Sequence, residues 1–123
     1  MTLLLDTNAL LWWLGDVELK ADARQAIADP GLDVYVSPVS LWEINIKVMA
    51  SKLHIEVPLA PRVRAEFRTL PVSLEHGDAA GALPLHHRDP FDRMLIAQAM
   101  IERLTVVTRD RRFADYDVAV LNC

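Results

Sequence analysis

The sequence predicts an α/β fold in which helices cover both faces of a short, mainly parallel sheet, giving three layers, α/β/α. Two observations favour this class. Short apolar segments alternate along the chain with longer segments of helical character. The apolar segments also lack a strict alternation of polar and apolar residues, which is typical of parallel strands buried on both faces. Hydrophobic residues make up 52% of the chain, so each element is expected to have a buried face.

The first elements follow from an apolar run and its boundary residues. Residues 2–5 are apolar throughout except for Thr2, which predicts a first buried strand. A short helix is expected to follow as far as Leu14, where Gly15 stops it. Its cap is expected to be Thr7 or Asn8, because either side chain can accept a backbone hydrogen bond.

A second strand and its flanking helices are predicted next. Residues 21–28 have helical character, and the Val-Tyr-Val segment at 34–36 predicts a strand. A third helix is expected to continue to about Ala50, with Ser37 as its cap and Pro38 in its first position.

Proline and β-branched residues bound the later elements. An Asp-Pro pair at 89–90 is a typical helix start, and residues 104–108 are rich in β-branched side chains. The elements expected in this part of the chain are helices over 61–69, 76–83 and 90–103, and strands over 71–73, 104–108 and 118–121.

Length and composition exclude several classes of protein. The 123 residues fit a single domain, 1–123, with a hydrophobic core. No apolar run reaches the roughly 20 residues that cross a bilayer, and the first residues lack the basic segment of a signal peptide. Cys123 is the only cysteine, which suits a reducing compartment. We therefore expect a cytoplasmic protein without membrane association.

The charge distribution is more informative than the net charge of −4, which offers nucleic acid no overall attraction. Six of the 13 basic residues lie in the last third of the chain, and all six are Arg, the better planar partner for phosphate. Solvated ion pairs on helix surfaces are the alternative explanation. The six are Arg88, Arg93, Arg103, Arg109, Arg111 and Arg112.

Four separated acids have positions that point to function. Asp6 and Asp110 follow predicted strands, and in open α/β sheets ligands bind at the carboxyl ends of strands. Glu43 lies one to two turns into the helix after the second strand. Asp92 lies in the first turn of a helix, where the helix dipole stabilises a negative charge.

Each acid also has an ordinary structural explanation. Asp6 and Asp110 can cap a helix or a turn. Glu43 can pair with Lys47 one helical turn along, and Asp92 has a spacing to the start of its helix that resembles a capping box.

Taken together, the four acids are better explained as a metal site. Clustered carboxylates repel one another and raise one another's pKa, so an ionised cluster needs a cation. Oxygen ligands without Cys or His suit Mg²⁺ or Mn²⁺. Such a site can activate water and stabilise the charge that develops on a phosphate.

Four segments carry a resemblance to a known family. The chain resembles PIN-domain proteins, and in particular the VapC-type toxins of bacterial toxin–antitoxin pairs. The segments come in the family's order and span nearly the whole chain. They are residues 3–14 (LLLDTNALLWWL), 36–47 (VSPVSLWEINIK), 86–99 (HHRDPFDRMLIAQA) and 107–113 (VTRDRRF).

The resemblance implies a PIN-like nuclease domain with about five strands, which cleaves RNA endonucleolytically with Mg²⁺ or Mn²⁺. It also implies a homodimer inhibited by a cognate antitoxin in a type II module. Its catalytic and metal-binding acids fall on Asp6, Glu43, Asp92 and Asp110, and its supporting hydroxyl and amide groups on Thr7, Asn8 and Thr108.

Several neighbouring residues receive a structural interpretation. His86 and His87 are expected in a solvated loop, and Asp89 is expected to cap the helix that follows it. Trp12 and Trp13 are expected to pack or to form a dimer surface rather than to stack on bases.

Two alternatives stay open for Arg88, Arg93 and Arg109: contacts to RNA phosphates, or salt bridges to the acids that they flank. Ser51 departs from the family pattern, because Gly is expected at that position. This departure puts only the end of the third helix in question.

Other functions remain alternatives. Asp6 would be the nucleophile of a phosphatase or phospho-acceptor domain, but those folds usually have a Lys after a late strand, and no Lys follows Lys52. A catalytically silent binding module would suit the acidic net charge. A DNA nuclease would use the same acids.

Overall fold

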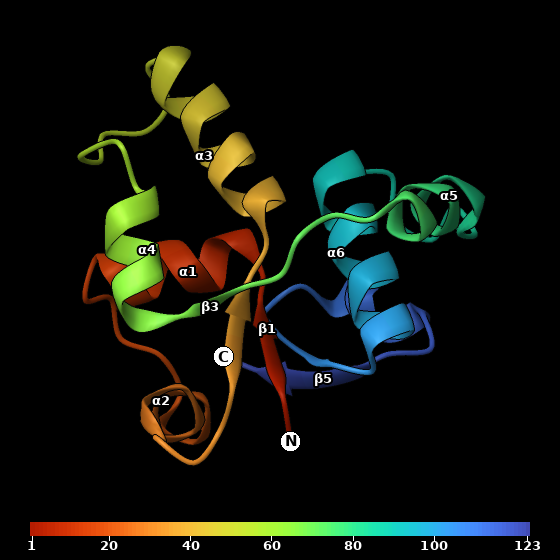
Figure 1. Ribbon diagram of the computed structural model, residues 1–123, viewed down its shortest axis with the longest axis horizontal. Helices are drawn as coiled ribbons and strands as arrows, with labels where there is room; N and C mark the ends of the chain where they lie inside the picture. The colour runs from red at the N-terminus through yellow and green to blue at the C-terminus, as the bar shows by residue number, and fades with distance from the viewer.

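The computed structural model describes residues 1–123 and contains one sheet of five parallel strands in the order β3-β2-β1-β4-β5 (Figure 1). The strands are β1 (Leu3–Leu5), β2 (Val34–Val36), β3 (Arg68–Thr69), β4 (Thr105–Thr108) and β5 (Ala119–Asn122). The helices are α1 (Thr7–Leu14), α2 (Ala21–Ala28), α3 (Pro38–Met49), α4 (Ala60–Glu66), α5 (Leu74–Ala82), α6 (Pro90–Glu102) and the 3₁₀ turn η1 (Arg111–Asp115).

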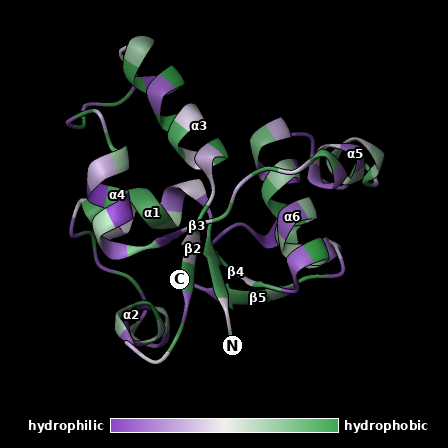
Figure 2. Cartoon of the chain, in the orientation of Figure 1, coloured by the Kyte–Doolittle hydropathy of each residue, from purple (hydrophilic) through white to green (hydrophobic).

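The central strand β1 separates two hydrophobic cores. Leu3 and Leu5 face one side of the sheet, and Leu4 faces the other, as expected from the two-residue period of a strand. Residues of α1, α2, α3 and α4 complete the first core, and residues of α6 and η1 complete the second. Helix α5 lies outside α6 in Figure 1, and Figure 2 shows hydrophobic residues concentrated on the strands between the helices. The predicted three-layer α/β/α class is confirmed.

The elements with clear boundary signals lie where the sequence predicts them. Strand β2 and helix α2 match residue for residue, and α3 has Ser37 as its cap and Pro38 at its start. Helix α6 begins at Pro90 under the cap of Asp89, as expected. No helix is both long and apolar enough to cross a bilayer.

The middle of the chain differs from the prediction. Helix α4 ends at Glu66 rather than at 69, and the edge strand β3 lies at Arg68–Thr69 rather than at 71–73. β3 pairs only with β2, so its position depends on backbone hydrogen bonds and not on an apolar pattern of its own.

Helix α5 begins two residues before its predicted start because of an unusual capping box. Ser73 accepts a hydrogen bond from the backbone N–H of His76, and the His76 ring accepts one from the backbone N–H of Ser73. Glu or Gln usually occupies the position of His76 in such a box. The expected strand at 71–73 is therefore wrong, because this segment ends in the cap of α5.

Candidate functional site

Strand β1 delivers Asp6 to the carboxyl edge of the sheet, where the side chain also caps α1. Asp6 Oδ1 accepts a hydrogen bond of 2.7 Å from the backbone N–H of Ala9. The expected cap at Thr7 or Asn8 is therefore wrong by one or two residues, and the ordinary explanation of Asp6 as a helix cap is confirmed. Asp6 is 4% exposed, and this burial raises its pKa despite the lowering by hydrogen bonds from Thr108 and Ala9.

The three supporting residues have different positions. The buried Thr7 hydroxyl donates to Ser40 Oγ at 3.1 Å and so ties α1 to α3. Thr108, at the end of β4, is buried beside Asp6, and its hydroxyl accepts the backbone N–H of Asp110 at 3.0 Å. Asn8 is exposed on α1.

Asp92 is held at the start of α6. The Asp89 carboxylate caps this helix by accepting the backbone N–H groups of Phe91 and Asp92, at 2.8 and 3.1 Å. Burial, followed by repulsion from Asp89, Asp6, Glu43 and Asp110, raises the pKa of Asp92 to about 8. Asp92 is therefore repelled by the other three predicted acids, although the four come from separate segments.

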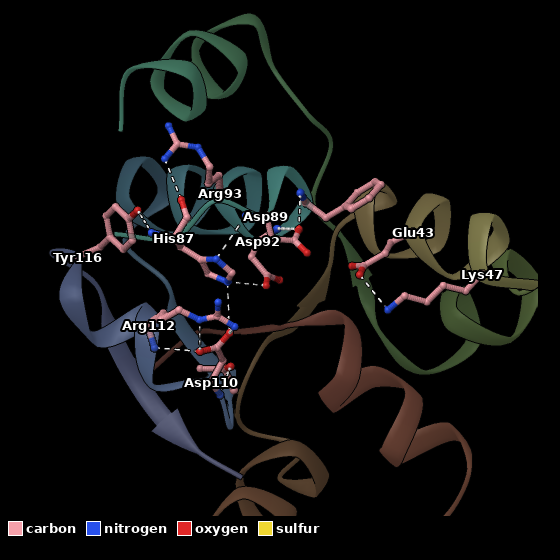
Figure 3. Close-up of polar contacts among 11 residues, drawn as sticks. Glu43, Lys47, His87, Asp89, Asp92, Arg93, Asp110, Arg112 and Tyr116 are labelled. Atoms are coloured by element: carbon pink, nitrogen blue, oxygen red, sulfur yellow. Dashed lines mark hydrogen bonds and ion pairs between the residues drawn. The ribbon is translucent and has the colours of Figure 1, made fainter. Parts of the chain in front are cut away.

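Asp110 has the opposite electrostatic setting. Burial favours a higher pKa, but hydrogen bonds from Arg112 outweigh it and hold the pKa of Asp110 below its ordinary value. The backbone N–H of Arg112 donates to Oδ1 at 2.9 Å, and its guanidinium contacts both carboxylate oxygens at 3.2 Å (Figure 3). Asp110 thus caps η1, as its ordinary explanation predicts. It also belongs to the acid group, the name used below for Asp6, Glu43, Asp92 and Asp110.

Glu43 contributes an oxygen atom without a protein partner. Oε2 pairs with the Lys47 ammonium at 3.1 Å, as the helical spacing predicts. Oε1 is buried and has no hydrogen-bond partner. A buried, unpartnered carboxylate oxygen is costly unless a ligand or ion satisfies it.

His87 lies between two of the acids, contrary to the expected solvated loop. It is only 2% exposed, and its Nε2 atom is 2.8 Å from Asp92 Oδ2 and 3.2 Å from Asp110 Oδ2 (Figure 3). The ring packs edge-on against Phe113, with centroids 5.9 Å apart. The prediction holds only for His86, which is exposed. The sole signal in the sequence was the position of His87 inside a family-like segment.

Arg93 does not make the salt bridge to the acids that was one of its two alternatives. Its guanidinium donates to four backbone carbonyls at 2.9–3.2 Å and makes no salt bridge to the acids. These hydrogen bonds fasten the loop between α5 and α6 to α6, so Arg93 is a structural anchor, and its contact with RNA phosphate stays a prediction. The carbonyls belong to Ala80, Leu83, Pro84 and His87.

Arg109 makes no salt bridge to the acids either. Its guanidinium carbon lies 3.9 Å from the centre of the Trp12 ring, and it donates to the Cys123 carbonyl at 2.9 Å. Trp13 packs edge-on against Phe67, as its packing interpretation predicts. Arg88 is exposed.

The residues of the site fit a hard divalent cation. The four acids offer oxygen atoms as ligands, burial and then mutual repulsion raise the pKa of Asp6 and Asp92, and Glu43 Oε1 lacks any protein partner. A cation would relieve both the repulsion and the unsatisfied oxygen. This donor chemistry suits Mg²⁺ or Mn²⁺.

The PIN domain family model matches residues 3–119 of the chain. The chain belongs to the PIN domain family. A relative of this PIN domain is ribonuclease VapC22 of Mycobacterium tuberculosis, 24% identical over 119 residues, covering 94% of this chain and 92% of the relative. The resemblance inferred from the four segments is thereby confirmed.

Solved structures show the same PIN fold. VapBC2 from Rickettsia felis, bound to a DNA fragment from its promoter, aligns over 100% of this chain and 99% of its own, with a TM-score of 0.75 and 16% identity. VapBC-5 from Mycobacterium tuberculosis, of the VapBC family of toxin–antitoxin systems, aligns over 98% of this chain and 96% of its own, with a TM-score of 0.61 and 22% identity.

Proposed function

We propose that this PIN domain is a Mg²⁺- or Mn²⁺-dependent endoribonuclease and the toxin of a type II toxin–antitoxin module. One observation carries the proposal: four acids from separate segments share one electrostatic environment at the carboxyl edge of the sheet. Such a cluster is costly for the fold alone, which favours a catalytic purpose.

The roles of the residues follow from their positions. Asp6 is the central ligand, since it ends the central strand and is repelled by both Asp110 and Glu43. Asp92 and Asp110 would complete the ligand set, and Glu43 Oε1 would hold the ion or orient a water. A divalent ion bound there would lower the pKa of water and neutralise charge on the phosphate.

Thr108 supports this set through its position. Its hydroxyl accepts the Asp110 backbone N–H and lies beside Asp6, so it holds the ends of β1 and β4 in register with the acids. Thr7 holds α1 against α3, the helix that carries Glu43. Asn8 is exposed and free to contact RNA.

The choice of RNA as substrate rests on the relative that is named a ribonuclease. The antitoxin partner rests on the VapBC complexes that share the fold, of which VapBC-5 belongs to a family of toxin–antitoxin systems. We further propose that residues 1–123 act as one domain, as a cytoplasmic homodimer.

The purified protein tests the proposal directly. It is expected to cleave single-stranded RNA with Mg²⁺ or Mn²⁺, and the Asp6→Asn variant is expected to lose this activity. Asn retains the Oδ1 atom that caps α1, so circular dichroism should show an intact fold. Asp78→Asn, at an exposed position on α5, is the matched control and should remain active.

Three results would contradict the proposal. Full activity of Asp6→Asn would show that the acids do not form the active site. Preferential digestion of DNA in a parallel assay would identify a DNA nuclease. Calorimetry that detects no Mn²⁺ binding would favour a silent binding module.

A further inference from the structure

His87 is a buried ionisable side chain that contacts the acid group, and the proposed reaction leaves it without a role. Its Nε2 atom lies within hydrogen-bond distance of Asp92 and Asp110, which belong to α6 and to the segment after β4. A side chain in this place either ligates the ion or positions the ligands.

The other ring nitrogen distinguishes these two roles. His87 Nδ1 accepts the backbone N–H of Asp89 at 3.3 Å, so Nδ1 acts as an acceptor. Nε2, which faces the acids, is then the ring nitrogen left to donate. A histidine that ligates a metal has a bare nitrogen toward the ion and usually donates its other N–H to an acceptor. His87 has the reverse arrangement, because Nδ1, the nitrogen that does not face the acids, contacts a donor.

The backbone of His87 is fixed from two sides. The Tyr116 hydroxyl accepts the His87 backbone N–H at 2.8 Å and itself donates to the Pro84 carbonyl. Arg93 donates to the His87 carbonyl at 3.2 Å (Figure 3). The ring therefore projects from a rigid loop, and its position does not depend on the acids alone.

We propose that His87 is a positioning residue of the metal site that donates its Nε2–H to Asp92 and Asp110 and fixes the orientation of both carboxylates. This inference rests on the proposed function, because the carboxylates are positioned for the ion. Without the ring, the carboxyl groups of Asp92 and Asp110, which come from separate segments, would have no common donor between them. The cluster would then be less preorganised for a cation.

Two variants of similar size separate this role from simple packing. His87→Gln keeps a side-chain N–H donor, whereas His87→Leu fills the space without one. Loss of an outer-shell partner typically weakens metal binding by about 10- to 100-fold, which is the increase in Mn²⁺ Kd expected for His87→Leu. His87→Gln should stay close to the wild type in Mn²⁺ Kd, although both variants alter the contact with Phe113.

Two spectroscopic measurements complete the test. Long-range ¹H–¹⁵N spectra of the metal-free protein should show the Nε2–H tautomer of His87. Electron spin-echo spectra of the Mn²⁺-loaded protein should show no directly coordinated histidine nitrogen. An Nδ1–H tautomer, a coordinated nitrogen, or equal Mn²⁺ affinity of wild type and His87→Leu would overturn the proposal.

The wild-type protein separates failure of this inference from failure of the proposed function. Absence of Mn²⁺ binding and RNA cleavage in the wild type overturns both. Binding and cleavage in the wild type, with an unaffected His87→Leu variant, overturn the role of His87 alone.

Discussion

Lys47 pairs with only one oxygen of the Glu43 carboxylate: its ammonium lies 3.1 Å from Oε2, while Oε1 is buried without a partner. The pair is thus both a helix-surface ion pair and part of the acid group. The Lys47 side chain is 40% exposed and that of Glu43 only 10%. Breaking the pair therefore costs free energy mainly through Glu43, whose buried carboxylate would lose its partner.

Removal of Lys47 should therefore destabilise the metal-free protein. We expect Lys47→Met to lower the free energy of unfolding by about 1 kcal/mol, since Glu43 would be left unpaired among other acids. Saturating Mn²⁺ should reduce the difference. Urea denaturation with and without Mn²⁺ checks both points, and an equal loss in the two conditions would contradict the second.

The stability of the metal-free protein should fall as the pH rises from 5 to 8. Asp92 has a folded-state pKa of about 8, against an ordinary value of 3.8, so between these pH values the folded state binds more protons than the unfolded state. Stability is then fully present below pH 4 and is lost as the pH approaches 8. The raised pKa of Asp6 acts in the same direction.

Asp92→Asn isolates this effect. We expect the wild type to lose about 3–4 kcal/mol between pH 5 and 8 in EDTA, and the variant to lose clearly less. Denaturation curves across this range provide the measurement. A variant as pH-sensitive as the wild type would assign the effect to another group.

Ser51→Gly should stabilise the protein. Ser51 has φ = 58° and ends α3 in a Schellman motif, with the Ser51 N–H bonded to the Val48 carbonyl and the Lys52 N–H to the Lys47 carbonyl. Gly adopts this left-handed conformation without the cost of a Cβ, which predicts a gain of about 1 kcal/mol in thermal or urea unfolding. Ala50→Gly, at φ = −85°, is the control and should destabilise.

Arg93 and Arg88 should behave differently when substituted. Arg93→Lys cannot reproduce the four carbonyl contacts and should lower the melting temperature by several degrees, which corresponds to about 1–3 kcal/mol. Arg88→Ala, at an exposed position, should leave stability unchanged and weaken RNA binding. Thermal scans and salt-dependent binding to RNA with the inactive Asp6→Asn protein check the pair. A stable Arg93→Lys protein would contradict its role as an anchor.

Local patterns determine much of this protein. The apolar runs, the Pro-led helix starts and the acids at strand ends are all encoded within a few residues. They therefore predict β1, β2, α2, α3 and α6 closely, and they place Asp6 and Asp110 at the carboxyl edge of the sheet. The four family-like segments predict the PIN domain family for the same reason.

Only the tertiary structure decided the features that depend on contacts between distant segments. The two-residue edge strand β3 exists because β2 lies beside it. His87 is buried because Phe113 packs against its ring and the Tyr116 hydroxyl binds its backbone N–H. Neither partner is local in sequence, so the position of His87 in the site follows from the packing of the whole chain.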